Sequence, residues 1–375
     1  MTFPSVRPRS GTASASTRLV LVALLVGMIV AAVSLARGDG DPAALVKFGE
    51  QRVERTEHAE AEMGREVVTL SDLGHDGQFF FIQALDPLHL DPGTHAALLD
   101  RPIYRSQRML YPLVAGGGGV VPATWLPWTM LAVNLAAVSL GTLAAARIAE
   151  RAGASPWWGL AFTLNIGMVF ELDISGAGVL AFAAALWGVA MLEEERLRAA
   201  TAWFVVAVLA REVMFLFLGG VILLRWWRTG RIPWLLGAVP TAAAGAWALY
   251  LRMRLSGHTD VDQVEEFGVP LRGLWLAFQN WLDRPLDLAV MAAVVAIIPL
   301  FVIRALRRPT YLGWGALGFV LMAALLSRQV WWRFFDITRA IAPVLTAYVM
   351  LTFVDGRTDD PAPVNAPPRT SVGAA

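Results

Sequence analysis

One short polar segment carries the residues best suited to chemistry. It runs from Gly74 to Pro87 and contains His75, Asp76 and Gln78, followed by three phenylalanines. An aspartate at a boundary between water and membrane can take a proton from a hydroxyl group when partial burial raises its pKa. The competing interpretation is structural. In that case Asp76 caps a helix after an Asp-Gly turn, and the phenylalanines anchor the helix at the membrane interface.

Guanidinium groups are the second feature with chemical potential. Arg105 and Arg108 lie three residues apart, on one face if the segment is helical, and such groups bind phosphate through charge-assisted hydrogen bonds. They could equally bind lipid headgroups or extend toward the membrane surface. Arg333, Asp336 and Arg339 form a similar group at the start of the last apolar segment, where we expect Arg339 to pair with Asp336 or with a ligand.

Arg211 and Glu212 form a charged pair between two short apolar runs, 199–210 and 213–224. Adjacent side chains diverge on a helix, so each of the two needs its own partner. An ionisable residue at membrane depth indicates a functional site, and an ion network at a helix break is the equally supported alternative.

A resident metal is not expected from the residue types. The chain has no cysteine, and His75, His89 and His95 lack the i,i+4 spacing that places two imidazoles on one helix face. If a divalent ion such as Mg²⁺ or Mn²⁺ is bound, Asp72 and Asp76 are the residues that would hold it.

The composition indicates a chain that crosses a membrane. Of its 375 residues, 56% are hydrophobic and 16% are charged, unlike an ordinary soluble domain. No basic tract or nucleic-acid-binding motif is present, so the bilayer is an expected partner and nucleic acid is not. Blocks of roughly 16–24 apolar residues can cross a hydrocarbon core about 30 Å thick. About ten apolar segments are expected: 19–36, 125–146, 157–172, 177–192, 199–210, 213–224, 234–251, 286–303, 311–326 and 337–354.

The charges predict an orientation. Arginines near 147–151, 196–198, 225–231 and 304–308 are typical of cytoplasmic loops, which places both ends of the chain inside. Successive loops alternate between the two sides of the membrane, as these arginines require, if 199–224 is a hairpin of two short helices. The polar loop 37–124 then faces outward.

We therefore expect a multi-pass protein of the inner (cytoplasmic) membrane. Its polytopic domain would cover 18–354, between disordered cytoplasmic segments at 1–17 and 355–375. The first apolar run, 19–36, is a retained helix in this interpretation. A cleaved signal sequence is the alternative, because Ser34-Leu35-Ala36 is similar to a cleavage site.

The motif pattern resembles the GT-C superfamily, whose members are integral-membrane glycosyltransferases that use lipid-phosphate-linked sugars. Over residues 41–112 it is similar to a bacterial group with a DGQF-type motif in the first loop. The matching residues are His75-Asp76-Gly77-Gln78-Phe79-Phe80-Phe81, then Ala84-Leu85-Asp86-Pro87, Tyr104-Arg105 and Arg108-Met109-Leu110-Tyr111-Pro112. Ala210-Arg211-Glu212 is similar to a recurrent Thr-Arg-Glu. His75 and Phe80 stand where that group has tyrosines.

The resemblance implies an all-α, GT-C-like fold and an inverting glycosyltransferase with its site at the outer membrane face. Asp76 would be the general base toward the acceptor hydroxyl, and Gln78 would orient a hydroxyl group. Arg105, Arg108 and Arg339 would bind a polyprenyl-phosphate-linked sugar.

Alternatives from other classes remain open. A transporter or lipid-handling protein would use Arg211, Glu212 and Asp336 as a polar pathway. A non-catalytic membrane assembly subunit would leave the outer loop without a cavity. The glycosyltransferase hypothesis requires Asp76, Arg105 and Arg108 to surround one cavity.

Overall fold

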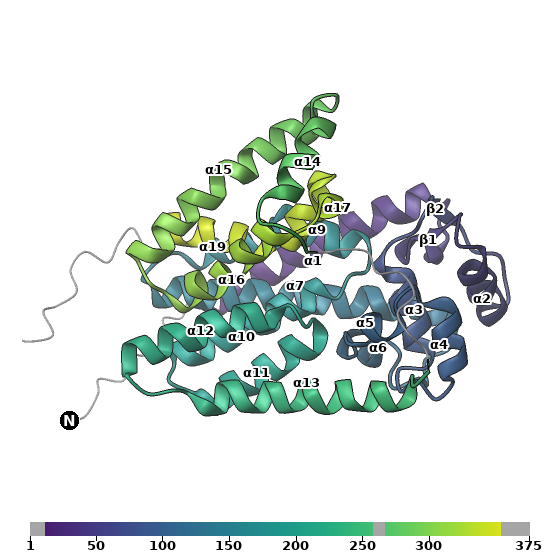
Figure 1. Ribbon diagram of the computed structural model, residues 1–375, viewed down its shortest axis with the longest axis horizontal. Helices are drawn as coiled ribbons and strands as arrows, with labels where there is room; N and C mark the ends of the chain where they lie inside the picture. Colours follow the sequence, from purple (N-terminus) through teal and green to yellow (C-terminus); the bar gives the residue numbers. More distant parts are fainter. Residues whose placement is uncertain (1–11, 258–266, 354–375) are drawn as a thin grey trace, which may run out of the picture.

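The computed structural model describes residues 12–257 and 267–353 and is predominantly helical (Figure 1). Its strands are β1 (Phe48–Gly49) and β2 (Thr69–Ser71), which form one short parallel pair. The expected all-α class is thus confirmed for this part of the chain. Residues 1–11 and 354–375 lie outside the described part and contain most of the two segments expected to be disordered. The first helix begins at Thr12, so residues 12–17 belong to it and not to a disordered leader.

Four of the described helices are long and apolar enough to cross a membrane. They are α1 (Thr12–Arg37), α7 (Leu126–Arg151), α13 (Trp234–Arg254) and α15 (Pro285–Arg307). At about 1.5 Å per residue, each is about 30 Å long or more. Helices α18 (Phe334–Ala340) and α19 (Ala342–Phe353) satisfy the same test together but are bent by 69° at their junction. The described residues thus contain four or five such spans, fewer than the ten apolar segments expected.

Shorter helices pack between and beside the long ones. They are α10 (Gly178–Glu193), α11 (Leu197–Ala210), α12 (Met214–Thr229) and α16 (Tyr311–Leu325). Helix α10 packs against α7 and α11, and nearly all its residues are buried. Because α11 and α12 are separate helices on either side of Arg211 and Glu212, the expected two-helix arrangement of 199–224 is present.

The apolar run at 157–172 is not one helix, which corrects the expectation of a span there. It divides into a 3₁₀ turn (Pro156–Gly159), α8 (Leu160–Thr163) and α9 (Ile166–Asp173). Asn165 explains the break, because its side chain accepts a hydrogen bond from the Gly167 amide at 2.9 Å and caps α9. Its Nδ2 atom donates to the Ala342 carbonyl at 2.8 Å, next to the junction of α18 and α19.

The polar segment after α1 folds into short elements at one end of the molecule (Figure 1). After a 3₁₀ turn (Pro42–Leu45) come α2 (Val53–Met63), α3 (Asp76–Leu85), α4 (Pro92–Leu98), α5 (Pro102–Ser106) and α6 (Leu110–Ala115), then a 3₁₀ turn (Ala123–Trp125). Near this end, α14 (Arg272–Trp281) and α17 (Arg328–Trp331) complete the described helices. Helix α2 is shorter than the polar stretch around it, because β1 and Gly64 limit it on either side.

The interior position of α3 overturns one expectation. Phe79, Phe80 and Phe81 are 6%, 3% and 0% exposed, so they are core residues and not interfacial anchors. Phe80 packs edge-on against Tyr111. A Cβ atom on Gly77 would lie 2.3 Å from the Val46 carbonyl oxygen, so only glycine permits this approach of α3 to the preceding loop. Helix α3 is therefore held firmly at its first turn.

Lys47, the chain's one lysine, ties α1 to α9. Its side chain is buried, and its backbone has a φ of 64°. The Nζ atom lies 3.2 Å from Asp173 Oδ1 and donates to Ser34 Oγ at 3.0 Å, while Ser34 donates to the same aspartate oxygen at 2.7 Å. This polar link joins α1 to the polar end of the fold.

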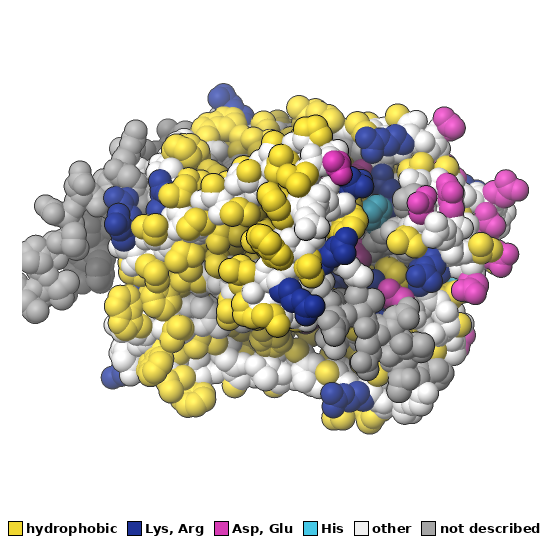
Figure 2. All heavy atoms as spheres, turned by 45° about the horizontal axis from the view of Figure 1, so that its top comes forward, with side chains coloured by type: hydrophobic (Ala, Val, Ile, Leu, Met, Phe, Trp, Pro, Cys, Tyr) yellow, Lys and Arg dark blue, Asp and Glu magenta, His cyan; other side chains and the backbone are white. Residues whose placement is uncertain are grey.

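Charged side chains divide between the two ends of the molecule. Figure 2 shows hydrophobic side chains across the middle of one face, Lys and Arg side chains at both ends, and Asp and Glu side chains gathered mainly at one end. At the other end, termed the basic end, Arg225 pairs with Glu195 at 2.8 Å, and Arg147 pairs with Glu194. Several apolar helices can thus cross a membrane, with charged residues at both limits of the apolar band.

Candidate active site

A cavity of about 320 Å³ opens at the polar end, between α3, α5 and α18. Five arginines and two aspartates supply its charged lining: Arg101, Arg105, Arg108, Arg211, Arg339, Asp76 and Asp336. Among the described residues, guanidinium groups thus outnumber carboxylates in the lining by three, while Asp100, Glu171 and Glu212 pair with these arginines outside the lining. Its apolar wall comes from Val213, Phe267, Met322, Leu326, Val330 and Ala340. The lining suits a ligand with an anionic part and an apolar part.

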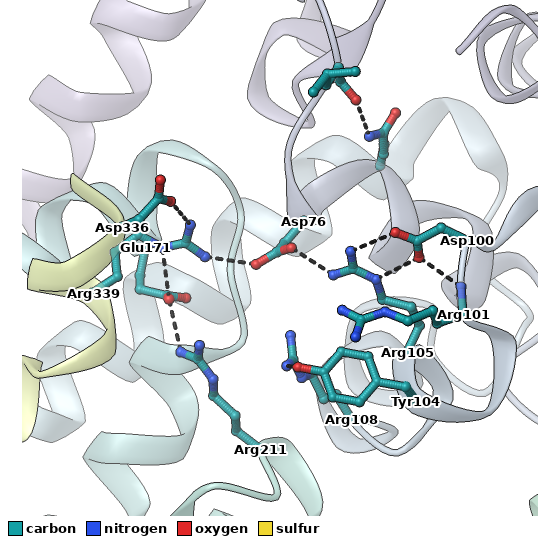
Figure 3. A network of polar contacts seen from close by, with 12 residues as sticks. Asp76, Asp100, Arg101, Tyr104, Arg105, Arg108, Glu171, Arg211, Asp336 and Arg339 are labelled. Atoms are coloured by element: carbon teal, nitrogen blue, oxygen red, sulfur yellow. Dashed lines mark hydrogen bonds and ion pairs between the residues drawn. The ribbon is translucent and has the colours of Figure 1, made fainter. Parts of the chain in front are cut away.

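Asp76 lies at the centre of this charged lining (Figure 3). It is the first residue of α3, and His75 occupies the N-cap position, so the expectation that Asp76 caps the helix is wrong by one residue. Its Oδ1 accepts a hydrogen bond from Arg105 at 2.9 Å, and its Oδ2 accepts one from Arg339 at 2.7 Å. Burial raises the pKa of Asp76, but Arg339 and Arg105 lower it by more, so its net pKa lies well below the ordinary value.

Two further carboxylates, on the side of these arginines away from the cavity, accept hydrogen bonds from them. Asp100 accepts hydrogen bonds from Arg105 Nε at 2.9 Å and Nη2 at 3.0 Å, a two-point contact that fixes the guanidinium plane. Glu171 is 1% exposed and accepts from Arg339 Nε at 3.0 Å and from Arg211 Nη1 at 2.9 Å. Neither acid lines the cavity, so both act through the arginines that do.

Arg211 and Glu212 separate as predicted. Arg211 is in extended conformation between α11 and α12 and turns toward Glu171. Glu212 instead accepts from Arg108 Nε and Nη2, both at 3.2 Å. Arg108 Nη2 also donates to the Tyr104 hydroxyl at 2.6 Å. The helix break thus supplies one cation to the cavity and one anion to a cavity arginine, which confirms the expectation of separate partners.

Aromatic rings orient the same guanidinium groups. Arg105 lies over the ring of Phe79, 4.0 Å from its centroid. Arg101 and Arg108 lie 4.2 Å and 4.9 Å from the centroid of Tyr104. Contacts of this kind stabilise a cation without consuming its hydrogen-bond donors. The arginines are therefore held in place while some of their N–H groups still face the cavity.

Four predicted site residues lie outside the cavity lining: Glu212, which pairs with Arg108, and Gln78, His75 and Arg333. Gln78 is buried, and its Nε2 donates to the Leu73 carbonyl at 3.0 Å. The ring of His75 packs edge-on against Phe335, and burial lowers its pKa. Arg333 lies 5.9 Å from the centroid of the same phenylalanine. These residues support the walls of the site and do not line it.

The described residues contain no group of three or more His, Asp and Glu side chains placed to hold a metal ion. Asp72 is exposed and does not line the cavity with Asp76. His89 and His95 stack with ring centroids 4.0 Å apart. His89 Nε2 is 2.6 Å from Ser106 Oγ, and burial lowers its pKa to about 3. The two imidazoles are buried packing groups in this arrangement.

Sequence reasoning missed several residues of the site: Asp100, Arg101, Tyr104 and Glu171. Glu171 had a usable signal, because it is an acid inside an apolar run and such residues are costly unless paired. Asp100 had none, since its contact with Arg105 depends on the turn that enters α5. Comparison of the chain with protein-family models, with curated proteins and with solved structures returned no match.

Proposed function

We propose that the protein is a membrane glycosyltransferase. It transfers a sugar from a polyprenyl-phosphate donor to an acceptor at the outer face of the cytoplasmic membrane. The observation that carries the proposal is the lining of the cavity, which combines an excess of guanidinium groups with an apolar wall. A polyprenyl-phosphate sugar has a phosphate for the first and a hydrocarbon chain for the second.

The chemistry requires little beyond what the cavity holds. An acceptor hydroxyl oxygen bonds to the anomeric carbon as the bond from that carbon to the phosphate oxygen breaks, which inverts the configuration. The phosphate leaves with the bonding electrons, and the arginines stabilise its growing charge. A carboxylate takes the hydroxyl proton. Among the described residues, Asp76 and Asp336 are the carboxylates that line the cavity.

The layout of the chain supports a GT-C-like fold. Asp76, Arg105 and Arg108 come from the long first polar loop, and they surround one cavity as the hypothesis requires. Arg147, Arg151, Arg225 and Arg228, which were predicted to be cytoplasmic, lie together at the basic end, which favours an outer position for the cavity. The ten-segment topology remains part of the proposal.

A one-sided site is also favoured over a polar pathway for transport. The ion pairs around Glu171 gather beside the cavity, at the N-terminal end of α10. Along α10 itself the buried residues, from Gly178 to Leu192, are all apolar or glycine. A route through the bilayer would need polar groups along its length.

The test is transfer from radiolabelled polyprenyl-phosphate sugars, assayed with membranes that contain the protein. We expect one of these sugar donors to give an acid-stable radiolabelled product. Arg108→Ala should reduce the rate by about 100-fold or more, because a hydrogen bond to the leaving phosphate is lost. Arg147→Ala, at the opposite end, is the matched control and should transfer normally. Failure of every donor with folded wild-type protein, or normal transfer by Arg108→Ala, would contradict the proposal.

A further inference from the structure

The two carboxylates that line the cavity are held very differently. Both oxygens of Asp76 accept charge-assisted hydrogen bonds, at 2.9 Å and 2.7 Å. Asp336 has one ion pair, 3.6 Å from Arg339 Nη1, and its side chain is 33% exposed. Among the described residues, no hydrogen bond reaches the Asp336 carboxylate. One acid is committed to arginines, and the other is available to a ligand.

Availability decides which acid can serve as a base. A general base must reach the hydroxyl proton through a free lone pair, and it works best when its pKa is near the operating pH. Each oxygen of Asp76 already accepts from a guanidinium group, so a hydroxyl that approaches a remaining lone pair meets Arg105 or Arg339 beside it. Those same arginines lower its pKa, so the anion has little tendency to take a proton.

The positions of the two acids fit different tasks. Asp76 lies between Arg339 and Arg105, where it sets the spacing of two guanidinium groups, and Asp336 lies at the far side of Arg339 (Figure 3). Asp287 accepts a hydrogen bond from the Phe334 amide at 3.0 Å, which anchors the start of α18 two residues before Asp336. The base candidate is thus on a fixed turn, next to the arginines but not enclosed by them.

We propose that Asp336 takes the proton from the acceptor hydroxyl and that Asp76 is a positioning residue. This inference rests on the proposed function. As the acceptor oxygen bonds to the anomeric carbon, its O–H bond breaks and the proton passes to an Asp336 carboxylate oxygen. The carbon–oxygen bond to the polyprenyl phosphate breaks in the same step, and the leaving phosphate keeps the electron pair near Arg105 and Arg339. Asp76 remains an anion throughout.

The first test compares matched amide variants in the transfer assay. Asp336→Asn should lower kcat about 100- to 1,000-fold, as expected for loss of a general base, with little change in the donor KM. Asp336→Glu should recover part of the rate and shift the acid limb of the pH profile. Asp76→Asn should chiefly raise the donor KM, because Arg105 and Arg339 lose their common anchor. Asp283→Asn, at an exposed aspartate after α14, is the control.

A second test needs no donor and separates this inference from the proposed function. In the ligand-free protein, a water-soluble carbodiimide with an amine should modify Asp336 faster than Asp76, measured by mass spectrometry of the two peptides. Faster modification of Asp76, or normal kcat in folded Asp336→Asn, would overturn the assignment. If wild-type protein transfers no sugar, the proposed function fails, and the labelling order then reports only the relative availability of the two acids.

Discussion

The two ends of the molecule use the same pair of side-chain types under different conditions. At the basic end, Glu194 lies near Arg147, Arg151 and Arg196, whose side chains are 44%, 41% and 60% exposed. At the cavity, Glu171 is 1% exposed, and its two arginine partners are 17% and 11% exposed. The number of partners is similar, and the difference lies in access to water.

The difference in access to water gives the ion pairs at the two ends different energetic consequences. Water replaces a lost partner at an exposed pair, so such a pair contributes about 0–1 kcal/mol. Removal of a buried acid takes a charged partner from arginines that water hardly reaches, which typically costs about 3–5 kcal/mol. In return, the cavity arginines stay fixed before any ligand arrives. We infer that the basic end serves orientation and loop packing, while the cavity end is prearranged for an anion.

Removal of the buried acid should have the largest effect. We expect Glu171→Gln to lower the free energy of unfolding by about 3–5 kcal/mol, because Arg211 and Arg339 lose a charged partner in the interior. Denaturant titration of the purified protein in detergent measures this. Unfolding that matches wild type would show that water reaches this acid and would remove the contrast between the two ends.

Geometry at the cavity should matter more than charge. We expect Arg108→Lys to reduce sugar transfer by about 100-fold, because an ammonium group cannot hold Glu212 through two points and present a planar donor to phosphate at the same time. Transfer rate with saturating donor measures the effect. Arg147→Lys is the paired substitution at the basic end and should keep the wild-type rate. Equal rates for both variants would refute the importance of the planar group.

The stability of the cavity end should decrease in acid. His89 has a pKa of about 3 in the folded protein, below its ordinary value of 6.5, so protons bind the unfolded chain first. Its stabilising contribution is complete above about pH 6.5 and is lost as the pH falls toward 3, by at most about 1.4 kcal/mol per pH unit. Unfolding midpoints between pH 7.5 and 4.5 measure this slope. His89→Asn should flatten it, and an unchanged slope would exclude this histidine as its source.

The acid with exposed arginine partners should give the smallest effect, although its own side chain is 10% exposed. We expect Glu194→Gln to change the free energy of unfolding by about 1 kcal/mol or less, with a change that shrinks as salt is added. The same denaturant titration at low and high salt measures it. A loss as large as that of Glu171→Gln would mean that the basic end is also closed to water.

Local reasoning identified most of the charged residues that line the cavity, but of the acids that hold them it identified Glu212 and missed Asp100 and Glu171. Asp76, Arg105, Arg108 and Arg339 were predicted because charged residues beside apolar segments are few and costly. Their partners depend on contacts across the fold: Glu171 and Arg339 are separated by 168 positions in the sequence. The same limit applies to the run at 157–172. Its apolar composition suits a span, but Asn165 caps α9 within it and donates to Ala342 and Thr346 of α19, contacts that depend on the folded chain.

The buried Lys47 gives the protein an internal reporter. Its amine is the one lysine amine in the chain, and it is enclosed with Ser34 and Asp173. Amine-reactive probes and lysine-specific proteases therefore have a single side-chain target, which becomes accessible when the loop between α1 and β1 opens. The rate of that one reaction measures how often the polar end of the fold separates from its first helix, without any engineered label.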